Sequence, residues 1–152
     1  MRAGNWRVAQ ASVAGESHLN QNAECQDRFL CRRAETSEGE ILIAVVADGA
    51  GSTMRGGRGA EIACEFFVEQ IFEFLNSGAA CVGSLNEDFG RRWISFFQAK
   101  IARLAREEKM EMREFASTLV GAIVGKTDAV FYQVGDGTAV FSVDGKKGSF
   151  QF

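Results

Sequence analysis

Three short segments place an aspartate beside a glycine or a glutamine at the end of a predicted strand: Gln26-Asp27, Asp48-Gly49 and Gly135-Asp136-Gly137. A carboxylate in this position is held rigidly and still reaches solvent, and a neighbouring glycine lets a metal or a phosphate approach closely. Several such carboxylates at one place would bind a hard divalent cation through oxygen ligands. Two such cations would activate a water and brace a phosphoryl group. Each segment alone is also an ordinary turn signal, so a metal site requires that the segments meet in space.

The hydrophobic pattern predicts the elements that would position these acids. Alternating or continuous apolar residues predict strands over 6–14, 28–33, 41–47, 116–125, 128–134 and 138–143. The unbroken run over 41–47 is typical of a strand covered on both faces. Apolar residues at helical spacing predict helices over 58–76 and 86–109. Because tight turns join the last strands as hairpins, the expected fold class is α+β with antiparallel sheets.

The composition excludes several classes of protein. With 152 residues, 46% of them hydrophobic, the chain has enough apolar material for the core of one domain, 1–152. With a net charge of -3, the chain lacks the excess of basic residues expected of a nucleic-acid-binding protein. No apolar run reaches the roughly 18 residues of a membrane span, and the N-terminus lacks the apolar stretch of a secretory signal. Four cysteines without a C-x-x-C pair favour free thiols in a cytoplasmic protein.

Four stretches of the chain share their order with the motifs of a known family. They are Val13-Ala14-Gly15-Glu16-Ser17-His18 followed by Cys25-Gln26-Asp27, Val46-Ala47-Asp48-Gly49-Ala50-Gly51-Ser52, Ala116-Ser117-Thr118-Leu119-Val120, and Val134-Gly135-Asp136-Gly137. Together they resemble the N-terminal half of the metal-dependent PP2C-type serine/threonine phosphatases, and most of all the bacterial branch of that family. The resemblance spans residues 8 to 143 or so, and implies an αββα sandwich of two mainly antiparallel sheets.

The resemblance also implies a metal centre. Asp48 would bridge two Mg²⁺ or Mn²⁺ ions, and Gly49 would offer its carbonyl oxygen to one of them. Asp27 would support the same ion, while Gln26 replaces the first carboxylate of the family's acidic pair with an uncharged amide. Asp136 would lie near an additional metal that some members bind.

The implied reaction is the hydrolysis of phosphoserine or phosphothreonine in a protein substrate. A hydroxide held between the two metals would attack phosphorus directly, without a covalent enzyme intermediate. Many members hold the substrate phosphate with an arginine upstream of the acidic pair. In this chain His18 stands at the comparable position, and Arg55 or Arg58 in the glycine-rich loop are candidates for the same role.

The family's remaining metal-binding carboxylates come from later motifs that have no counterpart before Phe152. We therefore expect a PP2C-like domain truncated at its C-terminus, a partial sandwich with weak or no activity alone. An open sheet edge would make self-association possible. Two alternatives remain, a catalytically inactive PP2C-like module that acts in protein–protein interaction, and an unrelated α+β binding domain.

Overall fold

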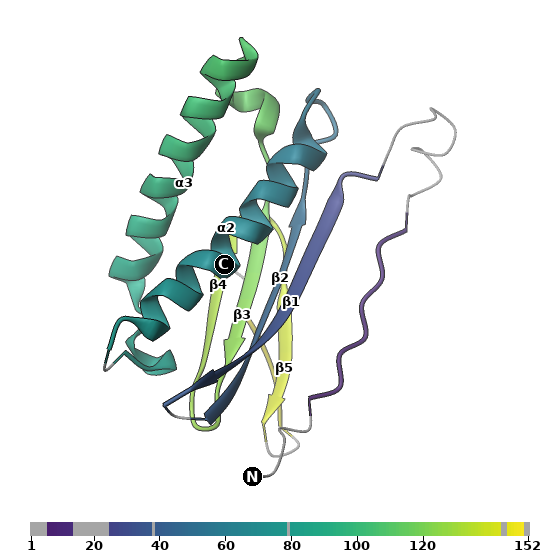
Figure 1. The fold of residues 1–152 in the computed structure, drawn as a ribbon. Helices are drawn as coiled ribbons and strands as arrows, with labels where there is room; N and C mark the ends of the chain where they lie inside the picture. The colour runs from purple at the N-terminus through teal and green to yellow at the C-terminus, as the bar shows by residue number, and fades with distance from the viewer. Residues whose placement is uncertain (1–5, 14–24, 38, 79, 144–145, 151–152) are drawn as a thin grey trace.

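The computed structural model describes residues 6–13, 25–37, 39–78, 80–143 and 146–150. They form an α+β fold, as the sequence predicts, in which two long helices lie against one face of a four-stranded antiparallel sheet of order β1-β2-β3-β4 (Figure 1). A second sheet holds β5 and β6. The elements are β1 (Asp27–Thr36), β2 (Gly39–Asp48), α2 (Gly56–Asn76), η1 (Val82–Ser84), α3 (Glu87–Glu108), η2 (Met112–Phe115), β3 (Leu119–Val124), β4 (Ala129–Val134), β5 (Ala139–Val143) and β6 (Lys146–Phe150).

The four-stranded sheet has two faces of different character. Alternate residues of β2 are buried against the helices, including Ile43 at 0% exposure, because successive side chains of a strand point to opposite faces. On the other face Val46 is 53% exposed, so the expectation that 41–47 is covered on both faces is wrong. Phe131 also lies on this second face and stacks on Phe141 of β5, with ring centroids 5.2 Å apart. The two sheets therefore meet face to face at this contact.

The core lies between the sheet and α2. Phe67 is 1% exposed and packs edge-on against Trp93 of α3 and Tyr132 of β4, at centroid distances of 5.6 and 5.8 Å. Gly121 of β3 faces the same ring, and a Cβ at that position would overlap with it. Phe67 thus joins both helices to the centre of the sheet.

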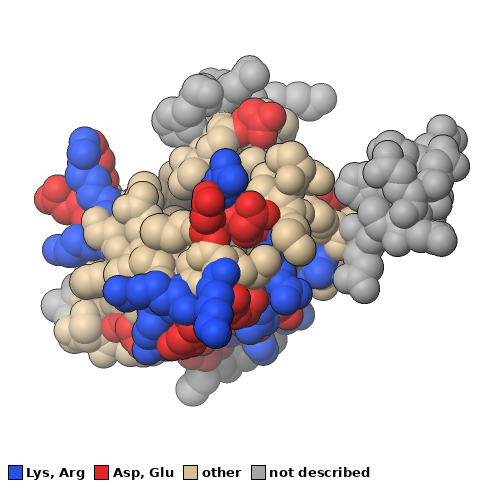
Figure 2. Space-filling view, turned by 90° about the horizontal axis from the view of Figure 1, so that it is seen from above, with Lys and Arg blue, Asp and Glu red and all other residues tan. Residues whose placement is uncertain are grey.

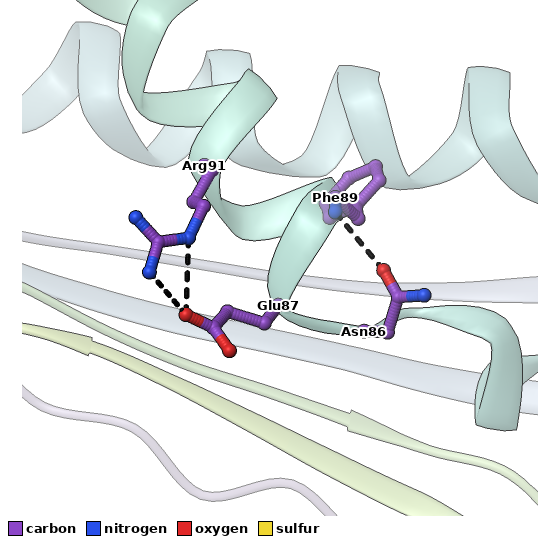
Figure 3. Close-up of polar contacts among 4 residues, drawn as sticks. All are labelled: Asn86, Glu87, Phe89 and Arg91. Atoms are coloured by element: carbon purple, nitrogen blue, oxygen red, sulfur yellow. Dashed lines mark hydrogen bonds and ion pairs between the residues drawn. The ribbon is translucent and has the colours of Figure 1, made fainter.

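The start of α3 is fixed by side chains in its first turn. Asn86 caps the helix, since its Oδ1 accepts a hydrogen bond of 3.1 Å from the Phe89 N–H (Figure 3). One turn later Arg91 pairs with Glu87, and both bonds end on the same carboxylate oxygen (Figure 3). No helix in the described part of the chain is both long and apolar enough to cross a membrane.

Two expectations about the strands need correction. Residues 6–13 were expected in a strand over 6–14, but they form no strand, and most of their side chains are exposed; residue 14 lies outside the described residues. Alternating apolar residues give a strand only where a partner strand is present, and none is described beside this segment. The sequence pattern also misses β6, because Lys146–Phe150 is short and mostly polar.

Candidate functional site

The hairpin of β1 and β2 places two of the predicted site residues side by side. The register of this antiparallel pair puts Asp27 directly opposite Asp48, and both residues are exposed. Side chains that are directly opposite each other point to the same face, with Cβ atoms about 4.5–5.5 Å apart. Asp27 is therefore a close neighbour of Asp48, on the sheet face turned away from the helices. Two carboxylates at this spacing can share one cation or a pair of cations.

The main chain at Asp48 is held by the segment that precedes β3. The Asp48 N–H donates to Thr118 Oγ1 at 3.0 Å, and the Thr118 N–H donates back to the Asp48 carbonyl at 2.8 Å. Gly49 forms an isolated bridge with Ser117, and the Ala50 N–H donates to the Ala116 carbonyl at 2.9 Å. The Ala-Ser-Thr motif of the sequence therefore fixes the backbone from which the Asp48 carboxylate projects. Sequence reasoning gave Thr118 no part in the site.

Gly49 and Gln26 are in direct contact beside the aspartate pair. A Cβ on Gly49 would overlap with the backbone of Gly56, so glycine is required there. The Gly49 N–H donates to the Gln26 carbonyl at 3.3 Å. In the orientation that satisfies its surroundings, the Gln26 amide nitrogen donates to the carbonyls of Gly49 and Ala50, both at 3.1 Å. Because a carbonyl oxygen has two lone pairs, Gly49 can accept this bond and still face a cation.

Asp136 lies in the turn after β4. Gly135 adopts a φ of 92°, in the left-handed region that favours glycine, and it packs against Thr118, the residue that binds the Asp48 backbone. Asp136 itself is exposed. Across the described residues, however, no three His, Cys, Asp or Glu side chains are grouped so that they could hold a metal ion. The structure thus joins Asp27 with Asp48 but does not bring Asp136 into a cluster with them.

The predicted phosphate-binding residues fall in two places. His18 lies outside the described residues. Arg55 and Arg58 both line a cavity of about 380 Å³ at the start of α2. Arg55 Nε lies 3.4 Å from Glu108 Oε2, and Arg58 Nη1 lies 2.5 Å from Glu61 Oε2. The hydrogen bond to Glu61 raises the pKa of Arg58.

Arg28 is a third arginine of this cavity, and sequence reasoning missed it. It directly follows Asp27 in β1, so strand alternation alone sends its side chain to the opposite face, toward α2. The alternation of side chains along the predicted strand could therefore have indicated that Arg28 faces α2. Seen from above, this end of the molecule carries basic and acidic side chains next to one another (Figure 2). No single sign of charge covers the visible surface, so a local excess of charge must be sought in individual cavities.

The donor atoms at the aspartate pair suit a particular class of metal. Two carboxylates and a backbone carbonyl are oxygen ligands, the set preferred by Mg²⁺ and Mn²⁺. Among the described residues, sulfur approaches the pair through Cys25, whose Sγ donates to Asp27 Oδ2 at 3.7 Å. The residues present thus fit hard divalent cations.

Three comparisons with known proteins each found a similar family, sequence or structure. A sequence model described as Protein phosphatase 2C matches residues 14–150. "Serine/threonine-protein phosphatase 3" of Escherichia coli (strain K12) is 29% identical over 137 residues, which cover 90% of this chain and 53% of that protein. A serine/threonine phosphatase structure from S. agalactiae is 16% identical, with a TM-score of 0.44, and the match covers 95% of this chain and 53% of that one. The chain thus spans about half the length of these relatives.

Proposed function

Since the chain belongs to the protein phosphatase 2C family, we propose that it forms the N-terminal portion of a metal-dependent serine/threonine phosphatase domain. The observation that supports this most is the pairing of Asp27 with Asp48 across β1 and β2, on an exposed edge of the fold. Phosphoserine and phosphothreonine proteins are the proposed substrates, and the cytoplasm is the proposed location.

In this proposal the chain's own residues hold the cations and the substrate. Asp48 and Asp27 supply the negative charge, and the Gly49 carbonyl supplies a neutral ligand. Gln26 keeps Gly49 and Ala50 in place through its amide. Mg²⁺ or Mn²⁺, when bound, would lower the pKa of a coordinated water and offset the charge of the phosphoryl oxygens.

Three further residues have proposed roles around this pair. Asp136 would support an additional cation from its turn beside Thr118. Arg55 and Arg58 would hold the substrate phosphate, since a guanidinium donates in a planar fork that matches phosphate oxygens. His18 is proposed for the same task.

We expect weak hydrolysis of p-nitrophenyl phosphate that requires Mn²⁺ and falls to the background rate in EDTA. Asp27→Asn should raise the Mn²⁺ concentration needed for half-maximal turnover about tenfold, because the loss of one charge-assisted contact costs roughly 1.5 kcal/mol. The measurement is a titration of Mn²⁺ at fixed substrate, followed by the absorbance of p-nitrophenolate.

A rate that is unchanged by EDTA would contradict the metal-dependent mechanism. The complete absence of turnover at every Mn²⁺ concentration would instead support the alternative, an inactive PP2C-like module that acts in protein–protein interaction. In that case we expect the chain to capture a phosphorylated partner in a pull-down and to release it still phosphorylated.

A further inference from the structure

The cavity at the start of α2 concentrates positive charge on an acidic chain. Three arginines line it, Arg28, Arg55 and Arg58, together with a single carboxylate, Glu61. The chain as a whole carries a net charge of -3. Glu108 and Glu61 offset the charges of Arg55 and Arg58, so the uncompensated positive charge of the cavity is that of Arg28, which favours an anion in this place.

Arg28 differs from the other two arginines in how it is held. Its Nη1 donates to the carbonyls of Cys25 and Asp27, at 2.7 and 2.9 Å, so the guanidinium is anchored by the backbone. Arg55 and Arg58 each pair with a carboxylate. Within the described residues no carboxylate pairs with Arg28. Its positive charge is thus fixed in position, and its remaining donors have no acidic partner among the residues that the structure describes.

The cavity adjoins the aspartate pair through Gln26. The Gln26 side chain lines the cavity, and its amide also contacts the Gly49 and Ala50 carbonyls next to Asp48. The side chains of Asp27 and Arg28 leave β1 on opposite faces, but the Arg28 guanidinium turns back to the end of the strand, where Nη1 donates to the Asp27 carbonyl at 2.9 Å. A peptide that places a phosphoryl group at the aspartate pair would therefore have its neighbouring residues within reach of Arg28.

We propose that Arg28, at this cavity, binds an anionic side chain of the substrate, either an acidic residue or a second phosphorylated residue, beside the phosphoserine or phosphothreonine whose phosphate Arg55 and Arg58 would hold. This inference rests on the proposed function, and it assigns that function a substrate class, acidic phosphoproteins. Arg28 is the residue that determines the preference. A planar guanidinium recognises carboxylate and phosphate oxygens equally well, because both present a pair of acceptors to its fork.

The test is equilibrium binding of two fluorescein-labelled peptides, measured by anisotropy in Mn²⁺, with a non-hydrolysable phosphonate analogue at the phosphoserine position so that no turnover occurs. One peptide carries three glutamates next to the analogue, and the other carries three alanines. We expect the wild-type chain to bind the acidic peptide about tenfold more tightly, the effect of one charge-assisted hydrogen bond. Arg28→Gln should remove this difference, and Arg28→Lys, which keeps the charge, should retain part of it.

The matched control is Arg91→Gln, which removes an exposed arginine near the start of α3. It should leave the preference for the acidic peptide intact. Equal binding of both peptides by the wild type, or a preference that survives Arg28→Gln, would overturn the proposal. If the proposed function itself is wrong, a separate measurement reveals it, because hydrolysis will then not depend on Asp48.

Discussion

Asp48→Asn should lower the Mn²⁺-dependent hydrolysis of p-nitrophenyl phosphate by about a hundredfold to a thousandfold. Asparagine has nearly the same shape as aspartate but carries no charge, so residue 48, a proposed metal ligand, would lose most of its attraction for a cation. Cations that stabilise a phosphoryl transition state contribute several kcal/mol, and each 1.36 kcal/mol corresponds to a factor of ten in rate. The rate constant is measured at saturating substrate over a range of Mn²⁺ concentrations.

The structure predicts that this substitution leaves the fold unchanged. The described hydrogen bonds that tie residue 48 to Thr118 use the main-chain N–H and carbonyl of Asp48, and both groups remain in the variant. The far-ultraviolet circular dichroism and the unfolding midpoint should therefore match the wild type. Asp128→Asn is the matched control, since Asp128 is exposed in the turn between β3 and β4 and pairs only locally with Thr127. A similar loss of rate in both variants would contradict a specific role for Asp48.

Phe67→Ala should destabilise the chain by about 3–5 kcal/mol. The side chain is 1% exposed and fills the space between Trp93, Tyr132 and Gly121, so its removal leaves a cavity between the helices and the sheet. The cost combines the lost burial of an aromatic ring with the lost contacts of the surrounding side chains. Urea unfolding gives the free energy of unfolding, and tryptophan fluorescence reports on it because Trp93 touches this ring.

A volume-conserving replacement provides the comparison. Phe67→Leu keeps most of the buried apolar surface and should cost less than about 1.5 kcal/mol. Phe96→Ala removes the same aromatic group from a position that is 56% exposed, and should change the free energy of unfolding by about 0.5 kcal/mol or less. Equal effects at residues 67 and 96 would show that Phe67 does not join α2 to the sheet in the way described.

The apolar pattern predicted the central elements because burial there is periodic. The run over 41–47 became part of β2, and the helix expected over 58–76 became α2, whose inner side is lined by residues such as Phe67 and Ile71. The strand predicted over 6–14 was wrong, because residues 6–13 have an alternating pattern but no described strand beside them. A strand depends on a second strand, and a single sequence does not say which segments pair.

The site was predictable in its residues but not in its geometry. Asp27 and Asp48 stood out by motif, yet their direct pairing follows from the register of a hairpin that turns at Thr36 and Gly39. Strand alternation would have placed Arg28 on the face toward α2, but its contacts with the carbonyls of Cys25 and Asp27 depend on how a long side chain folds back. Such contacts depend on rotamers and packing, which sequence spacing does not encode.

The most direct test of the account is a calorimetric titration of Mn²⁺ into the wild-type chain and into Asp27→Asn, Asp48→Asn and the double variant. If the two carboxylates share a cation site, each single substitution should weaken the Mn²⁺ affinity about tenfold or more. The double variant should lose less than the sum of the two, since neighbours that act on one ligand are coupled. Wild-type affinity in both single variants, or strictly additive losses, would contradict a metal centre built on the Asp27–Asp48 pair.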